Sequence, residues 1–280
     1  MSTREMTDVI GLTNSEASQL RDFMAGLDKE EWVRPSACVG WAVGDVFAHL
    51  TQGAHTWSDS IARAVAGDAD PPPGQQALRP GERGSEVTAQ RAIAYRQDTD
   101  EEGLLQAFAD GYHRLHQVLL DLKPQDWDRP CFHRRGIMPV RDYVGIRLQE
   151  LTVHGWDIRS TFDDTAEVSE KPLPALVGLV PRWLSNTFSH EPSLPTPVRY
   201  RFEVPGPVPV RQEVLVSQDS FQIGPIADGG ADVTFRCNTG NYILLIYGRL
   251  GLDWALDTGR LEVEGDRQLA SLFNTRFRGV

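Results

Sequence analysis

The stretch Gln149-Glu150-Leu151-Thr152-Val153-His154-Gly155-Trp156-Asp157 carries a carboxylate and an imidazole four residues apart. On a helix, side chains at this spacing project from the same face, one turn above each other. Glu150 and His154 could therefore reach a single divalent ion. A second helical stretch, Val43-Gly44-Asp45-Val46-Phe47-Ala48-His49-Leu50, places His49 where it could approach that ion from across a helix bundle. Two imidazoles and one carboxylate with an open position predict a catalytic metal site rather than a structural one.

Each of these residues also has an ordinary interpretation. A Glu-x3-His pair often faces solvent, and a histidine among apolar neighbours is often a satisfied core residue. The apolar flanks of Glu150 indicate that its helix is largely buried, and a buried unpaired carboxylate is costly unless something such as a metal compensates it. Asp157 could accept the second N–H of His154, as outer-shell carboxylates do, or could be a surface charge. The flanks are Leu148, Leu151, Val153 and Trp156.

Apolar periodicity in the first half of the chain predicts a helix bundle. A weak internal repeat supports it: Leu27-x4-Trp32-x-Arg34-Pro35 resembles Leu122-x4-Trp127-x-Arg129-Pro130, and each copy leads into a helix with a proposed ligand. If the match is not chance, it reflects a duplicated helix pair with His49 and Glu150 on facing helices. The expected helices are 6–27, 43–66, 86–95, 101–122 and 139–162.

The polar segment 163–172 ends in proline and predicts a domain boundary, with one domain over 1–165 and another over 174–280. Beyond it, alternating apolar residues predict strands between helices, so the second domain is expected to be small and α+β, as is the fold class of the whole chain. The expected strands are 198–204, 211–216, 221–223, 232–236 and 261–263, and the expected helices are 174–188, 239–250 and 267–277.

Composition narrows the class of protein. The net charge of −11 argues against nucleic acid or an anionic membrane as partner. The longest apolar run, Tyr242-Ile243-Leu244-Leu245-Ile246-Tyr247, is too short to span a bilayer. The chain has three cysteines, an odd number with no close pair in the sequence, and its N-terminus lacks a signal-peptide pattern. Both observations predict a soluble, cytoplasmic protein.

Other reactive residues carry a weaker signal. Cys38, expected near the mouth of the bundle, is either a small buried side chain or a nucleophile. His113 and His116 read as an ordinary helix face, and His133 and His190 as loop residues. No Gly-rich phosphate loop, Gly-x-Ser-x-Gly elbow or CxxC motif occurs, so hydrolase nucleophiles and nucleotide cofactors are unsupported.

The residues resemble a known family. Trp32-x2-Pro35-x2-Cys38-x-Gly40-Trp41-x-Val43-x-Asp45-Val46-x2-His49-Leu50, together with Glu150-x3-His154-Gly155-Trp156-Asp157, is similar to the mycothiol-dependent maleylpyruvate isomerases, which belong to the DinB-like superfamily of metal-binding four-helix bundles. The resemblance covers roughly residues 10–162. The second domain resembles, more faintly, the sterol-carrier-type domain of these isomerases, through Asp232-Val233-Thr234 and Leu244-Leu245-Ile246-Tyr247-Gly248-Arg249. One difference is Ala42, where relatives usually carry a helix-capping hydroxyl residue.

This resemblance implies specific roles. His49, Glu150 and His154 would bind a divalent metal, with zinc favoured, and mycothiol would be the thiol cofactor or substrate. Arg249 is assigned a catalytic role and a role in holding an anionic ligand or the thiol, unless it is a salt-bridged helix residue. Independently of the resemblance, an acidic protein that handles a carboxylate substrate needs local positive charge, and Arg79, Arg83 and Arg91 are candidates to supply it, although solvated charges explain all three equally well. Arg83 is also a second candidate for binding the thiol.

The predicted function is therefore a mycothiol-dependent isomerase or S-transferase, in which an activated thiolate adds to an electrophilic small molecule. Two alternatives remain open at this point. A non-heme iron oxygenase also uses two histidines and a carboxylate, and a small-molecule-binding protein of the same fold could have lost catalysis. The expected partners are a small-molecule substrate and a low-molecular-weight thiol, in a monomer or homodimer.

Overall fold

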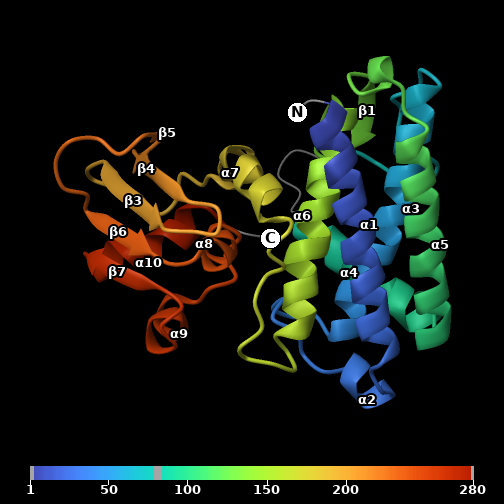
Figure 1. The fold of residues 1–280 in the computed structure, drawn as a ribbon, viewed down its shortest axis with the longest axis horizontal. Helices are drawn as coiled ribbons and strands as arrows, with labels where there is room; N and C mark the ends of the chain where they lie inside the picture. Colours follow the sequence, from blue (N-terminus) through green and yellow to red (C-terminus); the bar gives the residue numbers. More distant parts are fainter. Residues whose placement is uncertain (1–2, 79–83, 279–280) are drawn as a thin grey trace. The chain divides into compact units, whose positions relative to one another are not determined.

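The structure is a computed structural model that describes residues 3–78 and 84–278. The chain forms two compact units, Met1–Ala166 and Glu167–Val280. The first is helical apart from a small hairpin, and the second combines a mixed sheet with helices (Figure 1). The fold class is therefore α+β, as predicted. None of the described helices combines the length and the apolar character needed to cross a membrane.

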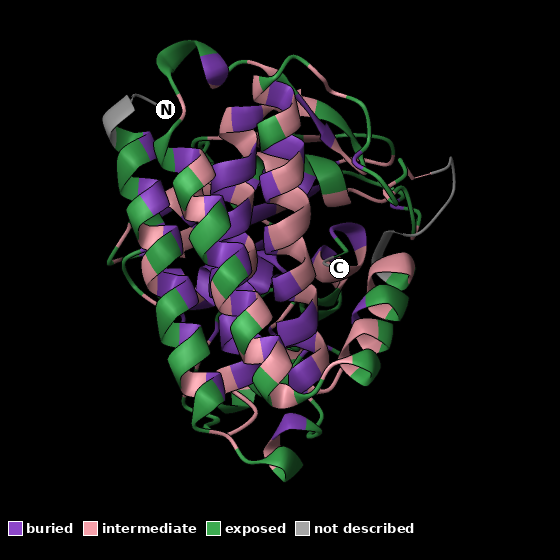
Figure 2. Cartoon of the chain, turned by 90° about the vertical axis from the view of Figure 1, so that its right-hand side faces the viewer, coloured by how far each residue is buried: buried purple, intermediate pink, exposed green. Residues whose placement is uncertain are grey.

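Four long helices build the first unit: α1 (Thr3–Ala25), α3 (Val43–Val65), α5 (Glu101–Leu120) and α6 (Val140–Arg159). In this bundle α3 packs against α5 and α6, and α1 packs against α5 and α6. Helix α4 (Gly84–Asp98) lies against α3, and the short helix α2 (Lys29–Trp32) precedes α3 in the chain. In α1, α3 and α5 buried positions recur at helical spacing because apolar residues drive the packing, whereas α6 is buried on most of its surface. Figure 2 shows buried and exposed positions along the helices of the bundle.

The core of the bundle is rich in aromatic side chains. Phe47 of α3 stacks on Phe108 of α5 with ring centroids 4.4 Å apart, and Trp32 meets Phe47 edge-on at 5.5 Å. All three rings are at most 1% exposed. Their contacts fix α3 against α5, and so fix the position of the later residues of α3 along the bundle axis.

The start of α3 lacks a capping side chain, but a neighbour compensates in part. Ala42 has the extended backbone of an N-cap residue, and its N–H donates to Asp45 Oδ2 at 2.9 Å. Gly44 has a use beyond flexibility: a Cβ there would lie 2.6 Å from Arg96 Nε and 3.2 Å from the Trp32 ring. The glycine lets the Arg96 guanidinium lie over Trp32, so its cost in helix propensity is partly offset by packing.

A hairpin leads into α6. Strands β1 (Pro130–His133) and β2 (Gly136–Pro139) pair antiparallel, and a 3-10 turn (Pro124–Asp126) precedes them. The sequence did not predict this hairpin, and the expectation that His133 lies in a loop was wrong, because it ends β1. Its ring lies 5.8 Å from that of Tyr143 on α6 and 6.1 Å from that of Trp57 on α3.

The second unit contains a five-stranded sheet in the order β5-β4-β3-β6-β7, in which β3 and β6 are parallel and the other neighbours antiparallel. Tyr200, Phe202, Phe235 and Phe273 pack together as its aromatic core. The strands are β3 (Val198–Val204), β4 (Val210–Val216), β5 (Phe221–Gly224), β6 (Val233–Arg236) and β7 (Glu262–Gly265), and the helices are α7 (Leu173–Thr187), α8 (Thr239–Ile246), α9 (Leu252–Asp257) and α10 (Arg267–Arg276).

Helix α8 is shorter than its apolar pattern predicted. It ends at Ile246 because Gly248 takes a left-handed backbone with φ of 71°. The N–H of Gly248 donates to Leu245 O, and the N–H of Arg249 donates to Leu244 O, which together form a Schellman motif. The expectation that the helix continues to Leu250 was wrong for this reason, and Arg249 lies in the turn after the helix.

Candidate metal centre

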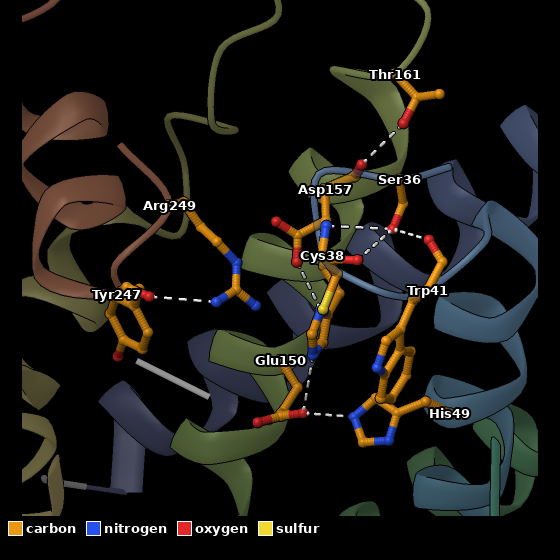
Figure 3. Close-up of polar contacts among 10 residues, drawn as sticks. Ser36, Cys38, Trp41, His49, Glu150, Asp157, Thr161, Tyr247 and Arg249 are labelled. Carbon is orange, nitrogen blue, oxygen red and sulfur yellow. Dashed lines mark hydrogen bonds and ion pairs between the residues drawn. The ribbon is translucent and has the colours of Figure 1, made fainter. Parts of the chain in front are cut away.

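Two helices that are distant in sequence bring the predicted ligands together. Nε2 of His49 on α3 lies 2.9 Å from Oε2 of Glu150 on α6 (Figure 3). Nε2 of His154, one turn further along α6, lies 3.6 Å from the same oxygen. The donor atoms of the three residues all lie within 4.8 Å of one another, which is a spacing at which they could hold one metal ion. The structure therefore brings together all three residues that the sequence singled out.

The site is partly open to solvent. The side chains of His49, Glu150 and His154 are 19%, 23% and 12% exposed. This exposure leaves room for a ligand to approach, in contrast to the closed donor sets of structural zinc sites.

A carboxylate behind the site orients one of the imidazoles. Nδ1 of His154 lies 2.8 Å from Oδ2 of Asp157, whose side chain is fully buried. A hydrogen bond from Nδ1 to a carboxylate leaves the lone pair of Nε2 free and aimed at the other donors, which is the usual outer-shell arrangement for a metal-binding histidine.

Burial and hydrogen bonding set the charges of the three side chains. Burial lowers the pKa of His49 despite its contact with Glu150, so its imidazole is neutral at neutral pH. Burial alone would raise the pKa of Glu150, but hydrogen bonds and attraction from His154 and His49 outweigh it and hold that pKa well below its usual value. For His154 burial opposes the charged form, yet the hydrogen bonds to Asp157 and Glu150 raise its pKa. An ionised carboxylate beside two imidazoles is the charge pattern that suits a divalent cation.

An aromatic wall completes the site. The Trp41 ring lies edge-on to His49, with centroids 5.5 Å apart, and parallel to His154 at 6.4 Å. The loop that carries Trp41 is tied to α6, because the N–H of Ala37 donates to the backbone oxygen of Asp157 at 3.2 Å. Within this loop Ser36 Oγ donates to Trp41 O at 2.9 Å, which ties the backbone of Trp41 to the rest of the loop.

The same loop brings a thiol to the site. Cys38, His154 and Asp157 form a second set of potential donors, within 4.8 Å of one another. Cys38 is 9% exposed and His154 belongs to both sets. The sequence placed Cys38 near the bundle mouth but not beside a specific ligand, because a loop residue has no spacing rule that would show its neighbours.

Of the four predicted arginines, the structure describes Arg91 and Arg249. Arg79 and Arg83 fall outside the described residues. Arg91 on α4 donates to Gln75 Oε1 and Gly74 O, and so ties α4 to the preceding loop. Arg249 belongs to the second unit, where Nη1 lies 3.3 Å from Tyr247 O.

An arginine that the sequence did not single out lies close to the ligands. Arg147 on α6 is 1% exposed and precedes Glu150 by three residues, on the same helix face. Its charge contributes to lowering the pKa of His49. The i, i+3, i+7 spacing of Arg147, Glu150 and His154 was the available signal.

Comparisons with known proteins find a family match for each of the two units. Residues 14–159 match the model of the mycothiol maleylpyruvate isomerase N-terminal domain, and residues 198–278 match that of the SCP-2 sterol transfer family. Among curated proteins, none matches the sequence.

Two solved structures share the fold over most of the chain. A mutant of the mycothiol-dependent maleylpyruvate isomerase is 15% identical with a TM-score of 0.64, and the match covers 94% of this chain and 96% of that one. The unmutated isomerase is 16% identical with a TM-score of 0.62, covering 89% and 93%. With the family match, these similarities confirm the resemblance seen in the sequence.

Proposed function

The chain belongs to the mycothiol maleylpyruvate isomerase family, and from this premise we propose that it is a metal-dependent enzyme that uses mycothiol on an electrophilic small molecule. The proposal includes an isomerase, in which the thiol is a cofactor, and an S-transferase, in which it is a substrate. The convergence of His49, Glu150 and His154 across two helices is the observation that carries it.

The three side chains fit a catalytic divalent ion. Two imidazole nitrogens and one ionised carboxylate suit zinc, and three protein ligands leave a further position open. When bound, such an ion supplies the positive charge that stabilises a thiolate at neutral pH. Glu150 contributes the negative charge, and Asp157 keeps the Nε2 lone pair of His154 available. Trp41 covers one side of the donor cluster and limits the directions from which a substrate can approach.

The reaction follows from thiolate chemistry. A thiolate that adds to one carbon of a cis double bond turns it into a single bond, which can rotate before the thiolate leaves. The result is isomerisation with the thiol regenerated. If the electrophile instead loses a leaving group, the thiol stays attached and the reaction is S-transfer. Consumption of one thiol per turnover therefore separates the two activities.

Metal content and thiol binding test the proposal. The native protein is expected to hold about one zinc per chain and to gain thermal stability with mycothiol only when the metal is present. His154→Ala should lose both properties. His113→Ala is the matched control, because it removes an exposed histidine from α5 and should change neither. A native protein without metal, or one whose stability mycothiol leaves unchanged, would refute the proposal.

The same measurements address the alternatives. Stoichiometric iron with oxygen consumption would indicate an oxygenase. A protein with no metal, and with ligand binding unchanged in His154→Ala, would indicate a non-catalytic binding protein.

We also propose that Arg249 acts in catalysis and in binding the anionic ligand or the thiol. This assignment rests on the resemblance of the Leu244–Arg249 stretch to the isomerases. Arg249→Met should then lower turnover while leaving the metal content unchanged. An unchanged turnover would assign Arg249 to the turn after α8 alone.

A further inference from the structure

Arg147 lies inside the bundle, next to the candidate metal centre. Its guanidinium lies 5.1 Å from the Trp57 ring on α3 and 5.6 Å from the Tyr112 ring on α5. Nη1 approaches Gly53 of α3 so closely that a side-chain carbon would collide with it. The guanidinium is therefore wedged among three helices, one turn from Glu150.

Along α3, the residues that face α6 at this level are not fully buried. His49, Gly53 and Trp57 follow one another at intervals of four residues, and each is of intermediate exposure. His49 contacts Glu150, whereas Gly53 and Trp57 both contact Arg147. This strip, His49-Gly53-Trp57, connects the metal ligands to the arginine along one helix face.

The polar atoms around this guanidinium lack partners. Nε and Nη2 of Arg147 and the hydroxyl of Tyr112 are buried, and none of them has a hydrogen-bond partner among the described residues. Within the described residues no carboxylate lies at ion-pair distance from Arg147 either. A buried cation of this kind is costly, and stacking on aromatic rings compensates only part of the cost.

Two other stacked arginines have polar partners for their terminal nitrogens, although Nε of Arg276 is buried without one. Arg276 is fully buried and lies over Phe188, and its Nη1 and Nη2 donate to the backbone oxygens of His190, Pro192, Ser217 and Gln218. Arg96 lies over Trp32 and pairs with Glu101 at 2.9 Å. Arg147 lies against aromatic rings as these two arginines do, but it has no hydrogen-bonding or ion-pair partner comparable to theirs among the described residues.

We propose that Arg147 binds a carboxylate group of the substrate, beside the metal centre. A carboxylate accepts two parallel N–H bonds from a guanidinium, and the Tyr112 hydroxyl could donate a further one. The ligand would approach along the His49-Gly53-Trp57 strip, with its carboxylate at Arg147 and its reacting carbon toward the metal ligands. Because the chain carries a net charge of −11, an anionic substrate needs such a local cation.

This inference rests on the proposed function only for the identity of the electrophile, so carboxylate binding at Arg147 can be tested separately from metal and thiol binding. The probes are succinate, an unreactive dicarboxylate, and succinamide, its uncharged counterpart, titrated calorimetrically into the full-length protein as purified. The wild type should bind succinate and not succinamide. Arg147→Met should weaken succinate binding at least tenfold, and Arg147→Lys should weaken it less, because the charge remains but the bidentate geometry is lost.

Matched controls separate binding from folding. Arg96→Met removes another guanidinium stacked on a tryptophan and should leave succinate affinity unchanged. Ligand-free Arg147→Met should melt at or above the wild-type temperature, because an uncompensated buried charge has been removed.

Three outcomes would overturn the inference: no succinate binding by the wild type, unchanged affinity in both Arg147 variants, or an equal loss in Arg96→Met. A drop in melting temperature of Arg147→Met with unchanged affinity would assign Arg147 a structural role instead. Failure of mycothiol to bind would refute the proposed function but would leave the succinate result standing.

Discussion

Replacing Asp157 with asparagine tests the outer shell of the candidate metal centre. The side chain is fully buried and makes a charge-assisted hydrogen bond of 2.8 Å to Nδ1 of His154. Such a bond contributes about 1.5–3 kcal/mol. Because asparagine keeps the shape but not the charge, we expect Asp157→Asn to weaken zinc affinity about 10- to 100-fold, which is the range found for outer-shell partners.

The assay is a competitive zinc titration with a chromogenic chelator at pH 7.5, with metal retention after gel filtration as a second readout. Asp126→Asn is the matched control, because it removes a buried carboxylate that bonds Arg129 at 2.8 Å, elsewhere in the same unit. This control is expected to bind zinc as the wild type does. An Asp157→Asn protein whose zinc affinity lies within threefold of the wild type would refute the outer-shell role.

Three further predictions concern pH and stability. The pKa of His154 is raised, so its proton competes with metal already above pH 6.5, and zinc affinity should fall about tenfold per pH unit below that pKa. The stability of the metal-free protein should change in the opposite direction, because the stabilisation from protonated His154 is lost as the pH rises through its folded pKa. A zinc affinity that does not change between pH 8 and 5.5 would contradict this prediction. Ala42→Ser should raise the free energy of unfolding by about 1 kcal/mol, because the backbone already has N-cap geometry and Asp45 supplies the reciprocal bond; an unchanged denaturation midpoint would show that the cap is already satisfied. Gly248→Ala should lower the free energy of unfolding by about 1–2 kcal/mol, because residue 248 has a left-handed backbone with φ of 71°. Chemical denaturation followed by circular dichroism measures this change, and an unchanged midpoint would contradict the prediction.

The helices were predictable because packing acts through a period that the sequence carries. Residues 43–66 were expected as a helix, and α3 spans Val43–Val65. The hairpin β1–β2 was not predictable in this way, since its apolar residues, Cys131-Phe132 and Ile137-Met138, are adjacent and do not alternate with polar ones. The adjacency of β3 and β6 was also hidden, because alternation shows which side chains share a face but not which strands are neighbours.

The candidate site also contains residues that the sequence predicted and residues that it did not. The spacing of Glu150 and His154 predicted a shared helix face, and the internal repeat predicted that His49 would face them. The position of Cys38 depends on how the loop before α3 folds back on α6, and the position of Arg147 depends on the missing side chain at Gly53. Both are consequences of three-dimensional packing, which neighbouring residues in the chain do not encode.

The two helices of the candidate metal centre contribute residues far apart in the chain: His49 and Glu150 are separated by 101 positions. An ion held by both would act as a tether that closes a loop of that length. Unfolding separates the ligands and releases the ion, so the binding free energy of the ion adds to the free energy of unfolding. We therefore expect metal starvation to shorten the lifetime of the protein in a cell, because proteases cleave the unfolded form.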